Sequence, residues 1–181
     1  MDRKVKVIIW KYTSLRNVGH AALELSDGTY ISWWPMLKKD NNFKGMATAM
    51  KSVEAMKDRT FEKDKDKDEG EGREPDEIVE IPVSQEQEQA IKNWWTGVLA
   101  NHNERYHLRT NNCSTMVYRA LREAGCFKAK REPVVSAWTP NMVLKYAKQC
   151  QKDKAKAIDI LDEVVEEYIE ASEKRIVSGT N

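Results

Sequence analysis

Residues 18–34, VGHAALELSDGTYISWW, predict a β-hairpin, and the hairpin indicates the class of fold. Two extended runs lie on either side of Ser26-Asp27-Gly28, which is a turn signal. A three-residue loop with Gly28 in the left-handed region would pair Ala22 with Ser32 and His20 with Trp34. A two-residue Asp27-Gly28 turn would instead put Ser32 on the opposite face of the hairpin. The sequence leaves both registers open.

Two more stretches predict strands that can join this hairpin. Residues 5–11, VKVIIWK, and residues 78–83, IVEIPV, are rich in β-branched residues. Pro35 is expected to end the second hairpin strand, and residues 38–57 fit a loose helix or an ordered loop. A small antiparallel sheet of three to five strands packed against helices makes an α+β domain.

Helix signals follow the last of these strands. Ser84 and Gln87 form a capping-box pattern, which predicts a helix over residues 84–101. Apolar residues at helical spacing predict a second helix that begins at or just after Cys113 and that Gly125 can end.

The C-terminal part predicts two more helices. Thr139-Pro140 is an N-cap followed by a proline at the first helical position, and a last amphipathic helix carries apolar residues from Ile158 to Ile169. We expect one domain over residues 1–150 and a helical extension over residues 151–181 with a frayed tail.

The composition favours a soluble protein without a nucleic-acid partner. Thirty Lys+Arg against 29 Asp+Glu give a net charge of +1, so the overall field favours neither nucleic acid nor stable membrane association. No window approaches the roughly 18 to 20 apolar residues of a membrane span, and the N-terminus has no signal-peptide pattern. We therefore expect a soluble chain.

The three cysteines, Cys113, Cys126 and Cys150, are odd in number and widely spaced. This pattern fits a reducing compartment better than a disulfide framework, and cytoplasmic localisation is expected. No Cys-x-x-Cys or His-x-x-x-His pair supports a metal site, and no cofactor is expected.

A charged insert interrupts the domain at about residues 62–75. Its core, KDKDKDEGEG, is too polar to bury an apolar face. We expect a solvated surface loop here, with contact to a partner as the alternative.

Cys113 is the first candidate for chemistry. A cysteine in the first turn of a helix lies at the positive end of the helix dipole and beside unpaired N–H groups, which stabilise a thiolate and can bind an oxyanion. A base must come from His20, His102 or His107. His102 and His107 lie in or beside a connecting loop, whereas His20 lies on a strand that fixes its direction.

Gly19 precedes His20, and the absence of a side chain there would let a helix terminus approach closely. The alternative for both candidates is structural. A free cysteine on an apolar helix face is commonly a small buried hydrophobe, and a strand histidine is commonly an ordinary core or surface residue.

The sequence resembles the circularly permuted papain-like cysteine hydrolases. The residues that carry the resemblance are 18–25 with Gly28-Thr29-Tyr30, and Asn112-Cys113-Ser114-Thr115-Met116-Val117 far downstream. This superfamily includes the NlpC-related, PPPDE (desumoylating isopeptidase) and lecithin:retinol acyltransferase groups. Residues 30–35 and 138–141 are similar to a less characterised branch that occurs also among bacterial effector-like proteins.

The resemblance implies a role for each site residue. Cys113 would be the nucleophile, His20 the general base and then the general acid, and Ser32 a candidate third residue that orients His20. Asn112 could donate to an oxyanion or cap the Cys113 helix. Three tryptophans could line a substrate groove or belong to the core: Trp33, Trp34 and Trp138.

The expected function is that of a thiol protease-like hydrolase. Cys113 and His20 would act as a dyad on amide or isopeptide bonds of a protein or peptide substrate, through an acyl-thioester. The alternatives are a thiol acyltransferase or thioesterase of the same fold, and a catalytically inactive binding module. The sequence predicts no oligomeric state.

Overall fold

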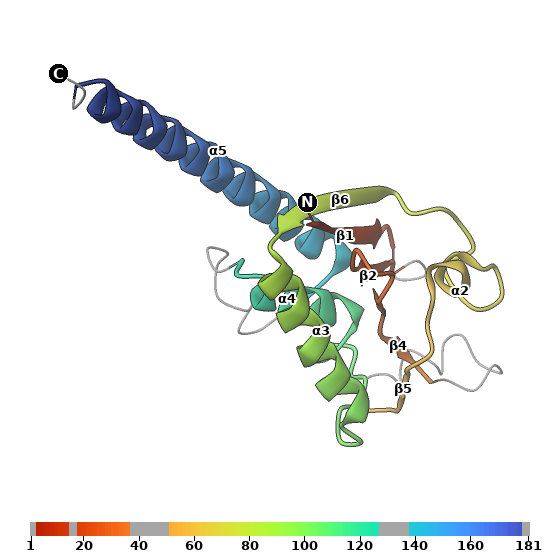
Figure 1. Cartoon of the computed structure of the whole chain (residues 1–181). Helices are drawn as coiled ribbons and strands as arrows, with labels where there is room; N and C mark the ends of the chain where they lie inside the picture. The colour runs from red at the N-terminus through yellow and green to blue at the C-terminus, as the bar shows by residue number, and fades with distance from the viewer. Residues whose placement is uncertain (1–2, 15–17, 37–50, 127–137, 179–181) are drawn as a thin grey trace.

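The computed structural model describes residues 3–14, 18–36, 51–126 and 138–178, with side chains up to residue 169. A four-stranded antiparallel sheet has the order β3-β2-β1-β6. Its strands are β1 (Arg3–Trp10), β2 (His20–Glu24), β3 (Tyr30–Ile31) and β6 (Glu77–Val83). The helices are α2 (Phe61–Lys65), α3 (Gln85–Ala100), α4 (Cys113–Glu123) and α5 (Pro140–Ser178) (Figure 1). The α+β class is confirmed.

The hairpin takes the register of the three-residue loop. Leu23 pairs with Ile31 and Glu24 with Tyr30, and the Leu25 N–H donates to the Thr29 carbonyl at 2.9 Å. Gly28 has φ +84°, in the left-handed region that favours glycine. Ser32 therefore shares a face with His20.

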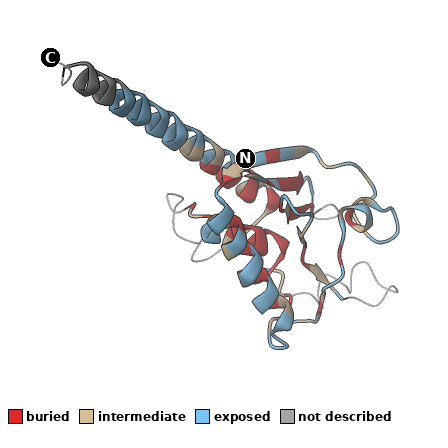
Figure 2. Cartoon of the chain, in the orientation of Figure 1, coloured by how far each residue is buried: buried red, intermediate tan, exposed pale blue. Residues whose placement is uncertain are grey.

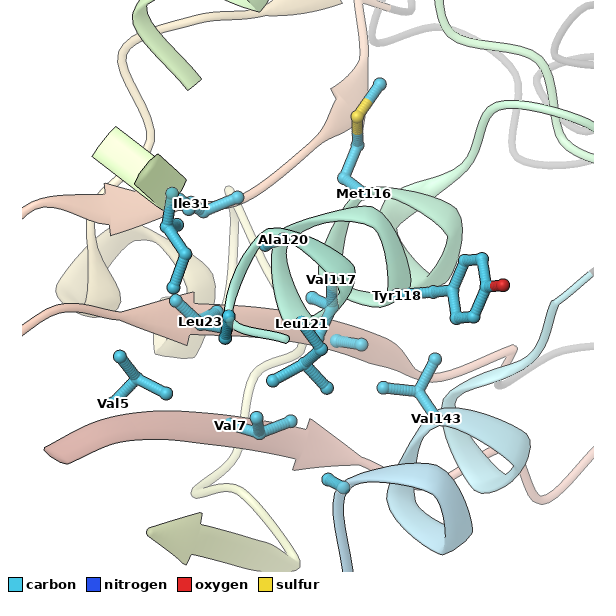
Figure 3. Close-up of a cluster of buried hydrophobic side chains, with 14 of the residues drawn as sticks. Val5, Val7, Leu23, Ile31, Met116, Val117, Tyr118, Ala120, Leu121 and Val143 are labelled. Atoms are coloured by element: carbon cyan, nitrogen blue, oxygen red, sulfur yellow. The ribbon is translucent and has the colours of Figure 1, made fainter. Parts of the chain in front are cut away.

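Helix α4 covers one face of the sheet with its apolar side. Val5, Val7 and Leu23 point from β1 and β2 toward Val117 and Leu121 of α4 (Figure 3). All five are fully buried, and each such side chain stabilises the fold by about 1.5–3 kcal/mol relative to exposure. This packing fixes the position of α4, and hence of its first residue, against the strands.

The opposite face of the sheet carries a smaller apolar cluster. Ile8, Trp10 and Ala22 alternate in the sheet with the residues that face α4, and Phe61 of α2 packs against them. The segment that contains α2 therefore covers the second face of the sheet, the face from which His20 projects.

The two remaining helix starts follow the sequence signals. Ser84 accepts from the Gln87 N–H, and the Gln87 side chain accepts from the Ser84 N–H, so the capping box of α3 is confirmed. The Thr139 hydroxyl accepts from the Met142 N–H at 3.3 Å, at the start of α5.

Two predictions about element ends are wrong. The second hairpin strand, β3, ends at Ile31 and not at Pro35. Trp34-Pro35 forms a separate short strand, β4, which pairs with β5 (Ala55–Met56) outside the main sheet. A strand this short accommodates proline, which has no N–H to donate. The two predicted C-terminal helices are one continuous helix, α5, which crosses the expected boundary at residue 150. The frayed tail and most of residues 38–57 lie outside the described residues.

Helix α5 has a packed half and an exposed half. Its first turns bury Val143, Tyr146 and Ala147 against the body, whereas the residues from Ala155 to Ile169 are exposed (Figure 2). Among the described residues, no helix is both long enough and apolar enough to cross a membrane.

Candidate active site

Cys113 is the first residue of α4 and is almost buried, with 8% of its surface exposed. Asn112 is the N-cap: its side-chain oxygen accepts from the Thr115 N–H at 2.9 Å. Its amide nitrogen donates to the carbonyls of Leu108 and Trp138, both at 2.8 Å. Because both amide hydrogens are used, Asn112 acts as a cap that fixes the helix start, and donors for an oxyanion must come from elsewhere.

His20 begins β2 and is 2% exposed. The preceding Gly19 has φ +68°, and a Cβ atom there would lie 2.3 Å from the Trp10 carbonyl oxygen. The close neighbour of Gly19 is thus the end of β1. The expectation of a helix terminus at this place is wrong. Only glycine lets the chain enter β2 at this point. Gly19 therefore fixes the backbone position of His20.

Asp64 of α2 is the residue that the sequence analysis missed. It is 0% exposed, and its Oδ2 atom lies 3.0 Å from Nε2 of His20. The expectation of a solvated loop over residues 62–75 is therefore wrong at its beginning: Thr60 caps a helical turn there, and that turn carries Asp64 under the sheet.

The Asp64 carboxylate accepts hydrogen bonds from three further side chains. Ser32 Oγ donates to Oδ2 at 2.6 Å and the Tyr30 hydroxyl at 2.9 Å. Arg59 Nε donates to Oδ1 at 2.8 Å, and its Nη2 lies 2.7 Å from the same oxygen. A buried carboxylate needs such a set of donors to stay charged, and here they also hold it against His20.

This arrangement determines which nitrogen of His20 faces the cysteine. An ionised carboxylate only accepts, so Nε2 must carry a hydrogen toward Asp64. Ser32 Oγ lies 2.9 Å from the same nitrogen, and its own hydrogen points to Asp64. The remaining nitrogen, Nδ1, is the one available for the hydrogen bond between His20 and Cys113.

The electrostatics of the pair favour a thiolate beside an imidazolium. Burial alone would raise the pKa of Cys113, but the charge and the hydrogen bond of His20, with the Ala21 N–H and the Ser114 side chain, lower it below the usual value. Burial alone would lower the pKa of His20, but the Cys113 thiolate and Asp64 raise it to about 10. Each group thus shifts the pKa of the other toward the charged pair.

Ser32 and Trp34 lie around His20, whereas Trp33 and Trp138 do not. Trp34 packs on the imidazole with 4.5 Å between ring centroids, and the Arg59 guanidinium lies 5.0 Å from the Trp34 ring. Trp33 is fully buried against Trp95 and so belongs to the core, which excludes it from a groove wall. Trp138 stacks on Tyr118 at 4.4 Å, beside the start of α4.

The other histidines do not take part in this cluster. His107 Nδ1 lies 2.9 Å from the Thr110 hydroxyl within its own loop, and His102 is exposed. Within the described part of the chain, no group of three or more His, Cys, Asp or Glu side chains could hold a metal ion.

Gly70 holds the turn that positions Asp64. A Cβ atom at Gly70 would lie 2.2 Å from the Asp64 carbonyl oxygen, so alanine there must displace α2. We expect Gly70→Ala to lower the free energy of unfolding by about 1–3 kcal/mol, as overpacking does.

A matched glycine in the same chain provides the control. Gly97 lies in α3 with nothing within 4 Å of its would-be Cβ atom. Gly97→Ala should stabilise by about 0.4–1 kcal/mol. Urea unfolding of both variants measures their free energies of unfolding. Equal values for the two variants would contradict the packing of Gly70 on Asp64.

The fold and the site together define an α+β protein in which a cysteine at a helix start, a strand histidine and a buried aspartate meet. By sequence the chain belongs to the IcsB middle domain family, whose family model matches residues 1–87 and 87–170. No curated protein and no solved structure matches the chain.

Proposed function

We propose that this protein is a cysteine-nucleophile hydrolase of amide or isopeptide bonds, acting through Cys113, His20 and Asp64. The observation that carries the proposal is the continuous chain of contacts from the Asp64 carboxylate through His20 to the Cys113 sulfur. Nucleophile, base and orienting group in hydrogen-bond contact are the arrangement that covalent acyl transfer needs.

The steps follow from the charges of the pair. The Cys113 thiolate attacks the substrate carbonyl carbon, a C–S bond forms, and the carbonyl electrons move to the oxygen. When the tetrahedral intermediate collapses, the leaving amine takes a proton from His20 Nδ1, and an acyl-thioester remains. His20 then takes a proton from water as the water oxygen bonds to the thioester carbon. The C–S bond breaks, the carboxylic acid leaves, and the thiolate is restored. Asp64 keeps the imidazole oriented throughout.

Transfer of the acyl group to an acceptor other than water is the second candidate. The burial of the site favours it, since Cys113 is 8% exposed and His20 is 2% exposed. A thioester that water reaches poorly persists long enough for an amine or a hydroxyl group to accept the acyl group. The same dyad would then serve an acyltransferase or a thioesterase.

Intact-mass spectrometry of the full chain with a panel of probes tests the proposal. A peptide or ubiquitin-like protein with a C-terminal electrophile should add one probe mass to the wild-type chain and none to Cys113→Ala. Acyl-thioester probes examine the second candidate in the same way, and hydroxylamine should release their adduct. Absence of any Cys113 adduct across the panel would sink both candidates and favour an inactive binding module.

A further inference from the structure

Tyr106 lies beside Cys113 and has no role in the steps described above. The chain reverses between them: the N–H groups of His107 and Asn111 each donate to the other residue's carbonyl, at 3.1 and 2.9 Å. In this antiparallel pairing the next residues outward are Tyr106 and Asn112. Tyr106 is thus directly across from the N-cap that precedes the nucleophile.

The backbone of Tyr106 is held on both sides. Its N–H and carbonyl pair with Val53, both at 2.8 Å. Arg119 of α4 donates to Glu104 Oε1 at 3.2 Å and to Asn111 Oδ1 at 3.0 Å, which ties the two ends of the loop to the helix that carries Cys113. Tyr106 therefore keeps a fixed place relative to the sulfur, as a preorganised donor must.

The Tyr106 side chain is buried with Cys113 in one cluster, at 6% exposure. Burial first, and then the charge of Cys113, raise the pKa of Tyr106 well above its usual value. The group therefore stays a neutral O–H donor at neutral pH.

We propose that the Tyr106 hydroxyl donates a hydrogen bond to the oxyanion that forms when Cys113 attacks a carbonyl carbon. The first N–H groups of α4, which have no acceptor within the helix, supply the other donors. Tyr106 keeps its proton during the reaction, so its contribution is to stabilise charge on the oxygen. This inference rests on the proposed acyl-enzyme chemistry and adds a catalytic residue to it.

Two reactions at the same sulfur test the role of Tyr106. Iodoacetamide alkylates the thiolate by displacement at a saturated carbon and forms no oxyanion, whereas p-nitrophenyl acetate acylates it through a tetrahedral oxyanion. In Tyr106→Phe, which removes one oxygen atom, acylation of Cys113 should slow by about 10- to 100-fold, the scale of a lost oxyanion donor. Alkylation should stay within about twofold of wild type.

Tyr118→Phe is the matched control, because Tyr118 is also buried but lies one turn into α4 against Trp138. Both of its rates should equal those of wild type. Equal acylation by wild type and Tyr106→Phe, or an equal loss in both reactions, overturns the role of Tyr106 alone. A wild-type chain that is alkylated but never acylated overturns the proposed function, and this inference with it.

Discussion

His20→Ala is expected to lower the alkylation rate of Cys113 at pH 6.5 by about 100-fold. The imidazolium charge and its hydrogen bond are the main causes that lower the pKa of Cys113, while burial acts in the opposite direction. Without them the thiol titrates at or above its ordinary value of about 8.5, which leaves roughly 1% thiolate at pH 6.5. Peptide-resolved mass spectrometry after a timed iodoacetamide pulse measures the loss.

The control for this variant is His102→Ala, which removes an exposed imidazole outside the cluster. Iodoacetamide should label Cys113 in His102→Ala at the wild-type rate. Circular dichroism of His20→Ala should show the native fold, since the apolar packing of α4 lies on the other face of the sheet. An unchanged Cys113 rate in a folded His20→Ala protein would remove His20 from the mechanism.

Asp64→Ala is expected to lower the free energy of unfolding by about 3–5 kcal/mol, the range for removing one partner of a buried ion pair. Asp64 is 0% exposed, and its loss leaves the buried Arg59 guanidinium without its carboxylate. It also removes the acceptor of the hydrogens on His20, Ser32 and Tyr30. Urea unfolding at pH 7 measures the change.

Asp58→Ala is a control from the same segment. Asp58 pairs with Lys63 at the surface, where solvent screens the salt bridge and it contributes little to stability. The two aspartates differ in burial and in partners, so a similar small effect in both variants would mean that Asp64 is not enclosed as described. The rate of Cys113 alkylation in Asp64→Asn measures the orienting role of the Asp64 carboxylate separately from its effect on stability.

The pH dependence of stability gives a second view of Asp64. Burial acts to raise its pKa, but the hydrogen bond and charge of His20, with Ser32 and Arg59, lower it from 3.8 to about 2. A lowered carboxyl pKa contributes stability above the unfolded value, and that stability is lost as the pH falls from about 4 to about 2. The lowering of the Asp64 pKa corresponds to about 2 kcal/mol in the free energy of unfolding. This part of the acid dependence should be absent in Asp64→Asn.

The sequence predicts the elements that follow local rules. The Ser84–Gln87 capping box, the Asn112 cap and the Gly28 turn depend on residues within one turn of each other, so their patterns are visible in the chain. The turn also determines the register, which puts Ser32 beside His20. The pairing of Cys113 with His20 is predicted by the resemblance, in which a histidine strand precedes a cysteine helix.

Asp64 could not be predicted because three of its four side-chain partners, His20, Tyr30 and Ser32, are far away in the chain. It lies in an alternation of lysine and aspartate in which Asp64, Asp66 and Asp68 look alike. Only the tertiary packing of α2 under the sheet selects the first of them. The one local signal was Phe61, the apolar residue at the start of the run, which anchors α2 against Trp10.

The continuous α5 was missed for a related reason. Residues 150–157 are mostly polar, and a polar run between two apolar stripes suggests a loop. They contain no glycine or proline to end the helix, however. Lys154 also anchors this stretch to the body by donating to the Gln87 side chain and the Ala124 carbonyl, both at 2.8 Å.

The thiolate–imidazolium pair of Cys113 and His20 is best tested by the pH dependence of iodoacetamide labelling at Cys113. Cys150, whose pKa is raised chiefly by its hydrogen bond with Cys126 and by burial, is the reference within the same chain. With the thiolate–imidazolium pair, the Cys113 rate should change less than about threefold from pH 8.5 to pH 6.5. A rate that falls about tenfold per pH unit over that range, as for an ordinary thiol, would contradict it.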